Sequence, residues 1–154
     1  LCNDMNIQWY YKKFNELTPT ELYRIMQLRS EVFVVEQNCV FLDADNKDDE
    51  CLHCMGWIDD DLAAYTRIAA PGYIYKEASI GRVATSPRHR AKGLGRQLMI
   101  ESLQICRSHF GNAEIKIGAQ YYLKDFYASF GFIPVGDTYI EDGIKHIYMT
   151  LPCK

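Results

Sequence analysis

The sequence predicts a mixed α/β fold in which a sheet lies between two layers of helices. Segments with strand-like alternation and β-branched residues alternate with longer segments that repeat apolar residues at helical spacing. Two further strand-like segments, joined by a short turn, end the chain. A length of 154 residues fits one domain, taken as residues 5–154 because residues 1–4 precede Met5, a candidate start. Strands and helices in this order are typical of a three-layer α/β sheet.

The first elements are a strand and a helix. Alternation over residues 7–12 predicts the strand, and Thr18-Pro19-Thr20-Glu21 has the spacing of a capping box with a proline at the first helical position. Arg29 and Glu36 lie on the apolar stripe of this helix, where charged residues seldom occur without a partner or a function. The apolar members of the stripe are Leu22, Ile25, Met26, Val32 and Phe33.

An acidic loop and a hairpin come next. Residues 43–50 are rich in carboxylates, and we interpret them as a solvated connection, with attraction of a cationic acceptor as the alternative. Residues 53–58 and 62–68 predict two strands around an Asp-Asp-Asp turn. Residues 73–77 are expected to form a loop.

The centre of the chain predicts a strand, a turn and a long helix. Residues 79–85 alternate and are β-branched, and Ser86-Pro87 ends this strand. The helix is expected to end at Gly111. Its apolar residues recur at helical spacing and are Leu94, Leu98, Met99, Leu103, Cys106 and Phe110.

The last third of the chain predicts a strand, a short helix and a hairpin. Residues 114–119 are expected to form the strand, and residues 121–129 the helix, which ends in the segment 130–134. Residues 136–140 and 144–151 predict a hairpin over Glu141-Asp142-Gly143.

The turn Arg90-Ala91-Lys92-Gly93-Leu94-Gly95 is a candidate anion site. The first backbone N–H groups of a helix have no intrahelical partner and lie at the positive end of the helix dipole. The two glycines allow close approach of a phosphate, and Arg90 and Lys92 add positive charge. The spacing does not match a P-loop or a dinucleotide-binding glycine motif. The turn therefore predicts a phosphate site, with a plain strand-to-helix turn as the alternative.

This turn resembles the acetyl-CoA pyrophosphate loop of the GNAT acetyltransferases, which reads Arg/Gln-x-x-Gly-x-Gly/Ala. A second block agrees with the same family, because Tyr127 lies in a short helix before Gly131-Phe132. The family's usual Asn and Ala fall on Gln120 and Leu123, and these departures concern the contacts to the pantetheine arm.

Further segments are similar to the ElaA-like branch of that family. They are Val32 to Gln37, Gly81-Arg82-Val83, Phe126 to Val135, and Glu141 to Ile147. The resemblance covers nearly the whole chain from Leu17 onward. It implies a GNAT fold whose central sheet is mostly antiparallel and whose fourth and fifth strands splay apart.

The resemblance also implies which residues bind the cofactor and supply the acid. The main chain of residues 83–85 would pair with the pantetheine arm, and an N–H near Val83 or Ala84 would face the thioester oxygen. Tyr127 would donate a proton to the departing thiolate, with a packing role as the alternative. The full predicted cofactor set is Val83, Ala84, Thr85, Arg90, Ala91, Lys92, Gly93, Leu94, Gly95, Arg96, Gln120 and Phe126.

Three residues are candidates for the base that deprotonates the amine. Glu36 is the first choice, and the alternative for it is a structural ion pair with Arg29 or Arg67. His53 and His146 could act through water, with a structural role in their strands as the alternative. The residues predicted to contact the acceptor are Arg29, His53, Arg67 and His146.

The composition of the chain indicates which classes of partner it can bind. A net charge of −3 disfavours a nucleic-acid surface, and the basic residues gather locally at Arg82, Arg88, Arg90, Lys92 and Arg96, as suits a small polyanion. No segment has the length of a membrane span and no leader pattern precedes the first strand, so a cytoplasmic protein without a membrane partner is expected. A homodimer is possible.

The cysteines predict neither a metal site nor a redox pair. Cys51-Leu52-His53-Cys54 has one pair of thiols, but a closed zinc site needs four ligands, and the pair enters a strand instead of opening a helix. Cys106 is expected in the core, and no covalent role is expected for Cys39 or Cys54.

The sequence therefore predicts an acetyl-CoA-dependent N-acetyltransferase that acts on a primary amine of a small molecule or peptide. Two alternatives are an acyltransferase that uses longer acyl donors and a non-catalytic CoA-binding module. Glu36 after Val32-Phe33 is faintly similar to acyl-homoserine-lactone synthases, which motivates the first alternative.

Overall fold

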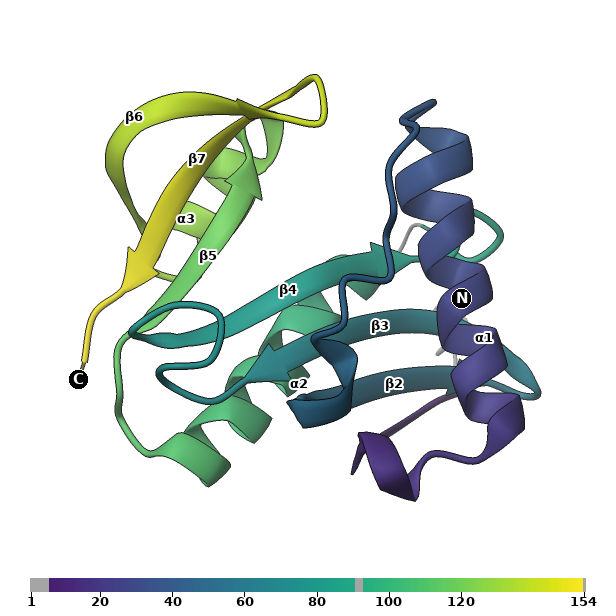
Figure 1. Cartoon of the computed structure of the whole chain (residues 1–154). Coiled ribbons are helices and arrows are strands. Elements are labelled where there is room, and N and C mark those ends of the chain that lie inside the picture. The colour runs from purple at the N-terminus through teal and green to yellow at the C-terminus, as the bar shows by residue number, and fades with distance from the viewer. Residues whose placement is uncertain (1–5, 91–92, 154) are drawn as a thin grey trace, which may run out of the picture.

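A seven-stranded sheet with the strand order β1-β2-β3-β4-β5-β7-β6 forms the centre of the computed structural model, which describes residues 6–90 and 93–153 (Figure 1). Every neighbouring pair is antiparallel except β4 and β5, which are parallel. The strands are β1 (Ile7–Lys13), β2 (Leu52–Ile58), β3 (Asp61–Ala69), β4 (Ala78–Thr85), β5 (Ile115–Gln120), β6 (Ile133–Glu141) and β7 (Ile144–Leu151).

The main helices are α1 (Pro19–Arg29), α2 (Leu94–Phe110) and α3 (Lys124–Ala128). A π-helical segment, η2 (Ser30–Glu36), continues α1. Short 3₁₀ turns are η1 (Phe14–Glu16), η3 (Asp48–Glu50) and η4 (Tyr121–Leu123). In the part of the chain that the structure describes, no helix is both long and apolar enough to cross a membrane.

Two apolar cores on opposite faces of the sheet give the predicted three layers. Residues of α1 pack with Met55, Trp57 and Tyr65 in one core. The stripe of α2 packs with the other faces of β2 and β3, and Tyr127 and Phe132 join the same core. Alternate residues of a strand point to opposite faces, so one strand supplies both cores. Figure 1 shows α1 in front of the sheet and α2 behind it.

The start of α1 follows the sequence prediction. The Thr18 side chain accepts a hydrogen bond from the Glu21 backbone N–H at 3.1 Å, and the Glu21 carboxylate accepts one from the Thr18 N–H at 2.8 Å. This reciprocal capping box satisfies two of the free donors of the first turn. It fixes where the helix that leads to Glu36 begins.

The parallel strands β4 and β5 touch only at their first residues. Ala78 pairs with Ile115 and Ser79 with Lys116, and no later pair forms between the two strands. Beyond Ser79 they diverge, as Figure 1 shows. The predicted splay of the fourth and fifth strands is confirmed, and it leaves one edge of β4 without a strand partner from Ile80 to Thr85 among the described residues.

The strand β6 begins earlier than predicted. Ile133 and Pro134 were expected at the end of the short helix, yet they pair with Thr150 and Met149 of β7. Because β6 is the edge strand of the sheet, a proline there removes no ladder bond that a further strand would need. The register shifts between Val135 and Tyr139, around Gly136 with its φ of 76°.

Candidate functional site

A cleft of about 790 Å³ opens where β4 and β5 separate. One wall is β4, with Gly81, Val83 and Thr85, and another is β5, with Gly118 and Gln120. The remaining lining comes from further residues of β4 and β5, from η2 and the loop after it, from the turn before α2 and its first residues, from η4 and α3, and from β6, β7 and their turn. These residues are Val32, Phe33, Glu36, Gln37, Cys39, Phe41, Leu42, Asp45, Ile80, Arg82, Arg90, Gly95, Ile117, Tyr122, Leu123, Phe126, Tyr127, Glu141, Asp142, Ile144 and His146.

A bulge in β4 shapes the wall of the cleft. Tyr65 of β3 pairs with Ala84 and Arg67 pairs with Gly81, so Arg82 and Val83 together face the single residue Thr66. Arg82 has a φ of 50°, in the left-handed region that a residue with a side chain rarely adopts. The bulge therefore turns backbone groups of β4 away from β3 and stores strain at the wall of the cleft.

The acidic loop holds this bulge in place. Asp43 Oδ1 lies 2.8 Å from Nε of Arg82, and the Asp43 backbone carbonyl accepts a hydrogen bond from Arg82 Nη2 at 2.9 Å. Asp45 Oδ2 lies 3.4 Å from the same Nη2. The prediction of a solvated connection is wrong for Asp43, which is buried, although most other residues of the segment 43–50 are exposed. Buried carboxylates need cationic partners, and these come from distant strands and from α1.

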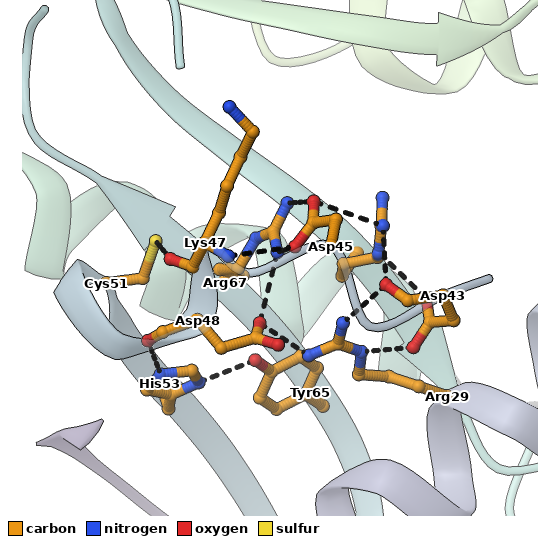
Figure 2. Close-up of polar contacts among 10 residues, drawn as sticks. Arg29, Asp43, Asp45, Lys47, Asp48, Cys51, His53, Tyr65 and Arg67 are labelled. Atoms are coloured by element: carbon orange, nitrogen blue, oxygen red, sulfur yellow. Dashed lines mark hydrogen bonds and ion pairs between the residues drawn. The ribbon is translucent and has the colours of Figure 1, made fainter. Parts of the chain in front are cut away.

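Three arginines and three aspartates form one network, which Figure 2 shows. The Arg29 guanidinium, fully buried, donates to Asp43 at 2.8 Å and to Asp48 at 2.7 Å. Arg67 donates to Asp45 at 2.7 and 2.9 Å and to Asp48 at 3.0 Å. We define Arg29, Arg67, Arg82, Asp43, Asp45 and Asp48 as the Arg–Asp network. Its charges balance, and it ties α1, β3 and β4 to the acidic loop.

The network also accounts for three residues expected at the acceptor site. Arg29 and Arg67 donate into it, and they are absent from the cleft lining. His53 is fully buried between the Tyr65 hydroxyl at 2.6 Å and the Asp48 backbone carbonyl at 2.8 Å (Figure 2). Burial lowers the pKa of His53, which favours its neutral form. The structure thus places Arg29, His53 and Arg67 behind the wall of the cleft, where an acceptor would not contact them.

The start of α2 lies at the mouth of the cleft. Gly93 precedes the helix with a φ of 74°, and its carbonyl accepts the first helical bond from the Gln97 N–H at 3.0 Å. Leu94, Gly95 and Arg96 occupy the first turn, where backbone N–H groups have no helical acceptor. A Cβ at Gly95 would meet Phe126 of α3 at an ordinary 3.8 Å. Ala91 and Lys92 lie outside the described residues.

The basic residues near this turn are engaged with protein groups, which differs from the expected free cationic patch. Arg88 donates to Glu31 at 3.1 Å. The side chain of Arg96 points to α3, where it donates to Ser129 Oγ at 3.1 Å and lies over the Phe130 ring. The charges of Arg82 and Arg88 are thus paired with carboxylates, whereas Arg96, within the described part of the chain, contacts only uncharged groups. The free backbone N–H groups are therefore the clearest feature of this turn for binding an anion.

Glu36 and Arg90 pair across the mouth of the cleft. Both Glu36 oxygens accept from the Arg90 guanidinium, one of them at 2.6 Å, and Arg90 also donates to the Thr85 carbonyl at 3.1 Å. The predicted ion pair of Glu36 with Arg29 or Arg67 is wrong. Hydrogen bonds from Arg90 lower the pKa of Glu36, so the carboxylate stays ionised.

Tyr127 lies between the apolar core and the cleft. It packs edge-on against Phe126 and Phe132, and it is only 5 % exposed, yet it lines the cleft. Burial raises the pKa of Tyr127, so its hydroxyl stays protonated at neutral pH. Of the other predicted cofactor residues, Val83, Thr85, Gln120 and Phe126 line the cleft, whereas Ala84 and Leu94 are buried in the cores.

Two contacts join the walls of the cleft near the β6–β7 turn. The side-chain amides of Gln37 and Gln120 exchange hydrogen bonds at 3.2 and 3.4 Å. Cys39 Sγ donates to the Asp142 backbone carbonyl at 3.2 Å. His146, on β7, lines the same side, so it is the one predicted acceptor residue that the structure places in the cleft.

The two thiols of the Cys51 to Cys54 segment are buried and separate. Cys51 donates to the Lys47 carbonyl at 3.1 Å, and Cys54 lies in the core near α2. Burial raises the pKa of each thiol to about 11, so neither is a thiolate at neutral pH. Cys106 is in the core, as predicted.

Sequence reasoning missed the Arg–Asp network and the left-handed Arg82. One signal was available, because Arg67 and Arg82 interrupt strands that are otherwise apolar or β-branched. Such residues predict buried acidic partners, and residues 43–50 contain a cluster of carboxylates that could supply them.

Comparison with known proteins agrees with this geometry. A family model described as an acetyltransferase (GNAT) domain matches residues 43–153. The chain is 43 % identical to the protein ElaA of Escherichia coli over 93 % of this chain and 95 % of ElaA.

Solved structures show the same relationship. An acyl-CoA N-acyltransferase from Pseudomonas aeruginosa superposes with a TM-score of 0.89 at 39 % identity, covering 94 % of this chain and 98 % of that one. The crystal structure of E. coli ElaA superposes with a TM-score of 0.87 at 42 % identity, covering 94 % and 98 %. The splayed strands, the glycine turn and this similarity lead to one conclusion: the chain belongs to the GNAT acetyltransferase family, beside ElaA.

Proposed function

We propose that the protein is an acetyl-CoA-dependent N-acetyltransferase that transfers the acetyl group directly to a primary amine of a small molecule or peptide. The observation that carries this proposal is the free edge of β4 beside the start of α2 and Tyr127. In an acyl thioester of this kind, the free edge of β4 would bind the amides of the arm and the start of α2 would bind the pyrophosphate. Tyr127 would lie near the sulfur.

The residues present fit coenzyme A. Backbone groups of successive strand residues point alternately to the two sides, and β5 has left β4 after Ser79. Groups of the segment 80–85 are therefore available to the amides of the pantetheine arm. The N–H groups of the first turn of α2, and those predicted for Lys92 and Gly93, would bind the pyrophosphate. Gln120 and Phe126 line the path of the arm.

The proposed reaction is a direct transfer. The ammonium of the acceptor first loses one proton to give the neutral amine. The amine nitrogen then attacks the thioester carbonyl carbon, the C–S bond breaks, and the nitrogen loses a second proton. A backbone N–H near Val83 or Ala84, released by the bulge at Arg82, would stabilise the charge that develops on the carbonyl oxygen. The Arg–Asp network holds the bulge, so this donor is fixed before the substrate arrives.

Tyr127 is the proposed acid. The departing thiolate takes a proton from the phenol, which burial keeps protonated until the C–S bond breaks. Glu36 and His146 line the acceptor side and remain the two candidates for the group that takes the proton from the amine. Carboxylates at Glu36, Glu141 and Asp142 would favour a cationic acceptor.

The experiment that tests this function measures thiol release from acetyl-CoA and octanoyl-CoA with a panel of small amines and lysine-containing peptides. We expect release that requires an amine, with acetyl-CoA preferred, and an acetylated amine in the mass spectrum. Preference for octanoyl-CoA would favour an acyltransferase for longer donors. Tight CoA binding without turnover on any amine would favour a binding module.

A further inference from the structure

His146 has a ring orientation that its surroundings fix. It lies on β7 between Tyr139 of β6 and Gln120 of β5, and its ring stacks on that of Tyr139 with centroids 5.5 Å apart. Its Nδ1 lies 2.7 Å from the backbone carbonyl of Ile144. A carbonyl oxygen only accepts hydrogen bonds, so Nδ1 must carry a proton.

This hydrogen bond determines the chemistry of the other ring nitrogen. In a neutral imidazole, one nitrogen donates and the other accepts. With Nδ1 as the donor, Nε2 of His146 has its lone pair free, and the side chain lines the acceptor side of the cleft. A histidine that lines the cleft therefore has one ring nitrogen, Nε2, that is free to accept a proton.

The carboxylate of Glu141 lies close enough to His146 to stabilise the protonated form of its ring. Glu141 Oε2 lies 3.8 Å from Nε2, too far for a hydrogen bond but close enough to stabilise an imidazolium. Glu141 is largely exposed, so a proton taken up by the ring has a route to solvent. The other groups packed against the ring, the Tyr139 phenol and the Gln120 amide, carry no charge at neutral pH.

Glu36 and His53, the two alternative bases, are less suited than His146 to accept a proton from the amine. Both oxygens of Glu36 are hydrogen-bonded to Arg90, which lowers the pKa of the carboxyl group and so its proton affinity. His53 is fully buried, and both of its nitrogens are engaged. Histidine is also the side chain whose charge changes most readily between about pH 5 and 8, where a general base is most useful.

We propose that His146 Nε2 is the general base that takes the proton from the attacking amine, with Glu141 as the residue that stabilises the resulting imidazolium. The proposal rests on the proposed acetyl transfer. The N–H bond of the amine breaks as the N–C bond forms, the proton moves to Nε2 directly or through one water, and it then leaves to solvent. Tyr127 separately protonates the thiolate, and its phenolate regains a proton from solvent before the next turnover.

The test is the pH dependence of kcat in a His146→Asn variant, measured with acetyl-CoA and the best amine of the panel. Asparagine retains an N–H donor for the Ile144 carbonyl but has no basic nitrogen. We expect kcat to fall by about a hundredfold or more, the acidic limb of the pH profile to disappear, and added imidazole to restore part of the rate. His109→Asn, which removes an exposed histidine on α2, should leave the profile unchanged.

Three results would overturn the proposal. An active wild-type enzyme whose His146→Asn variant keeps its rate and its acidic limb would exclude His146 as the base, and loss of the limb in Glu36→Gln would assign that role to Glu36. Imidazole nitrogen NMR of the wild-type protein that shows a protonated Nε2 and a bare Nδ1 would exclude it even if the variant did not fold. Absence of turnover in the wild-type protein would instead refute the proposed function, and this role with it.

Discussion

Tyr127 places a fixed ring and a protonated hydroxyl at the cleft. Its ring is fixed by Phe126 and Phe132, and its residue lines the cleft. Burial raises the pKa of the phenol, so it does not ionise before the thiolate forms. The motif in the sequence located this tyrosine. The sequence did not show that its ring packs against Phe126 and Phe132 or that it lines the cleft.

Replacing Tyr127 with Phe should lower kcat by about a hundredfold while the affinity for acetyl-CoA stays close to that of the wild type. The substitution removes the hydroxyl and keeps the ring that packs in the core. Steady-state kinetics and calorimetry measure the two quantities. Tyr23→Phe, on the exposed side of α1, is the control and should change neither. Wild-type turnover in Tyr127→Phe would mean that the residue serves packing alone.

At the scale of elements, the acidic loop acts as a clamp on β4. The loop residue Asp43 and the strand residue Arg82 are 39 positions apart in the chain, so no local pattern predicts that they meet. Local alternation and capping predicted most strands and the main helices, because those depend on neighbouring residues. The clamp, the bulge and the early start of β6 depend on partners that are distant in sequence, and these were missed.

The clamp predicts a specific dependence of stability on pH. Burial raises the pKa of Asp45, but hydrogen bonds from Arg67 and the charges of Arg67 and Arg82 outweigh it and lower that pKa from 3.8 to about 2. A carboxylate whose pKa is lowered by folding stabilises the protein above its unfolded pKa, and this is lost as the pH falls through the folded value. The shift corresponds to about 2 kcal/mol, present above pH 4 and lost between about pH 4 and 2.

Replacing Asp45 with Asn should therefore lower the free energy of unfolding at pH 7 by about 2 kcal/mol or more, since Arg67 also loses a charged partner. The difference from the wild type should shrink as the pH falls from 4 to 2. Urea unfolding at several pH values measures this. Asp60→Asn, in the exposed β2–β3 turn, is the control and should have little effect. A pH-independent difference would contradict the assignment of the ion pairs.

The glycine turn gives the second prediction at this scale. Gly93 and Gly72 both have a positive φ, 74° and 87°, and a Cβ at either position would meet nothing within 4 Å. Valine at either site should cost about 1–2 kcal/mol of stability, because the backbone strain is the same. Only Gly93→Val should weaken acetyl-CoA binding, since Gly72 lies in the β3–β4 loop, outside the cleft. Unchanged affinity in folded Gly93→Val would mean that the turn does not bind the pyrophosphate.

At the scale of the whole molecule, the sheet is two halves joined at a narrow point. Strands β1 to β4 form one half and β5 to β7 the other, and within residues 6–90 and 93–153 the strand pairs that join them are those at Ala78 and Ser79. The cores on both faces hold this geometry, so the free edge of β4 is a permanent feature of the fold. The sequence predicted the splay only through the family resemblance, because strand propensity does not reveal which edges remain unpaired.

The central claim is that acetyl-CoA binds along this free edge and at the start of α2. Amide hydrogen exchange with and without saturating acetyl-CoA tests it most directly. We predict added protection within residues 80–85 and residues 94–96, with smaller changes in β1 and β2, which lie far from the cleft. Saturating acetyl-CoA that protects other segments and leaves both of these unchanged would contradict the account.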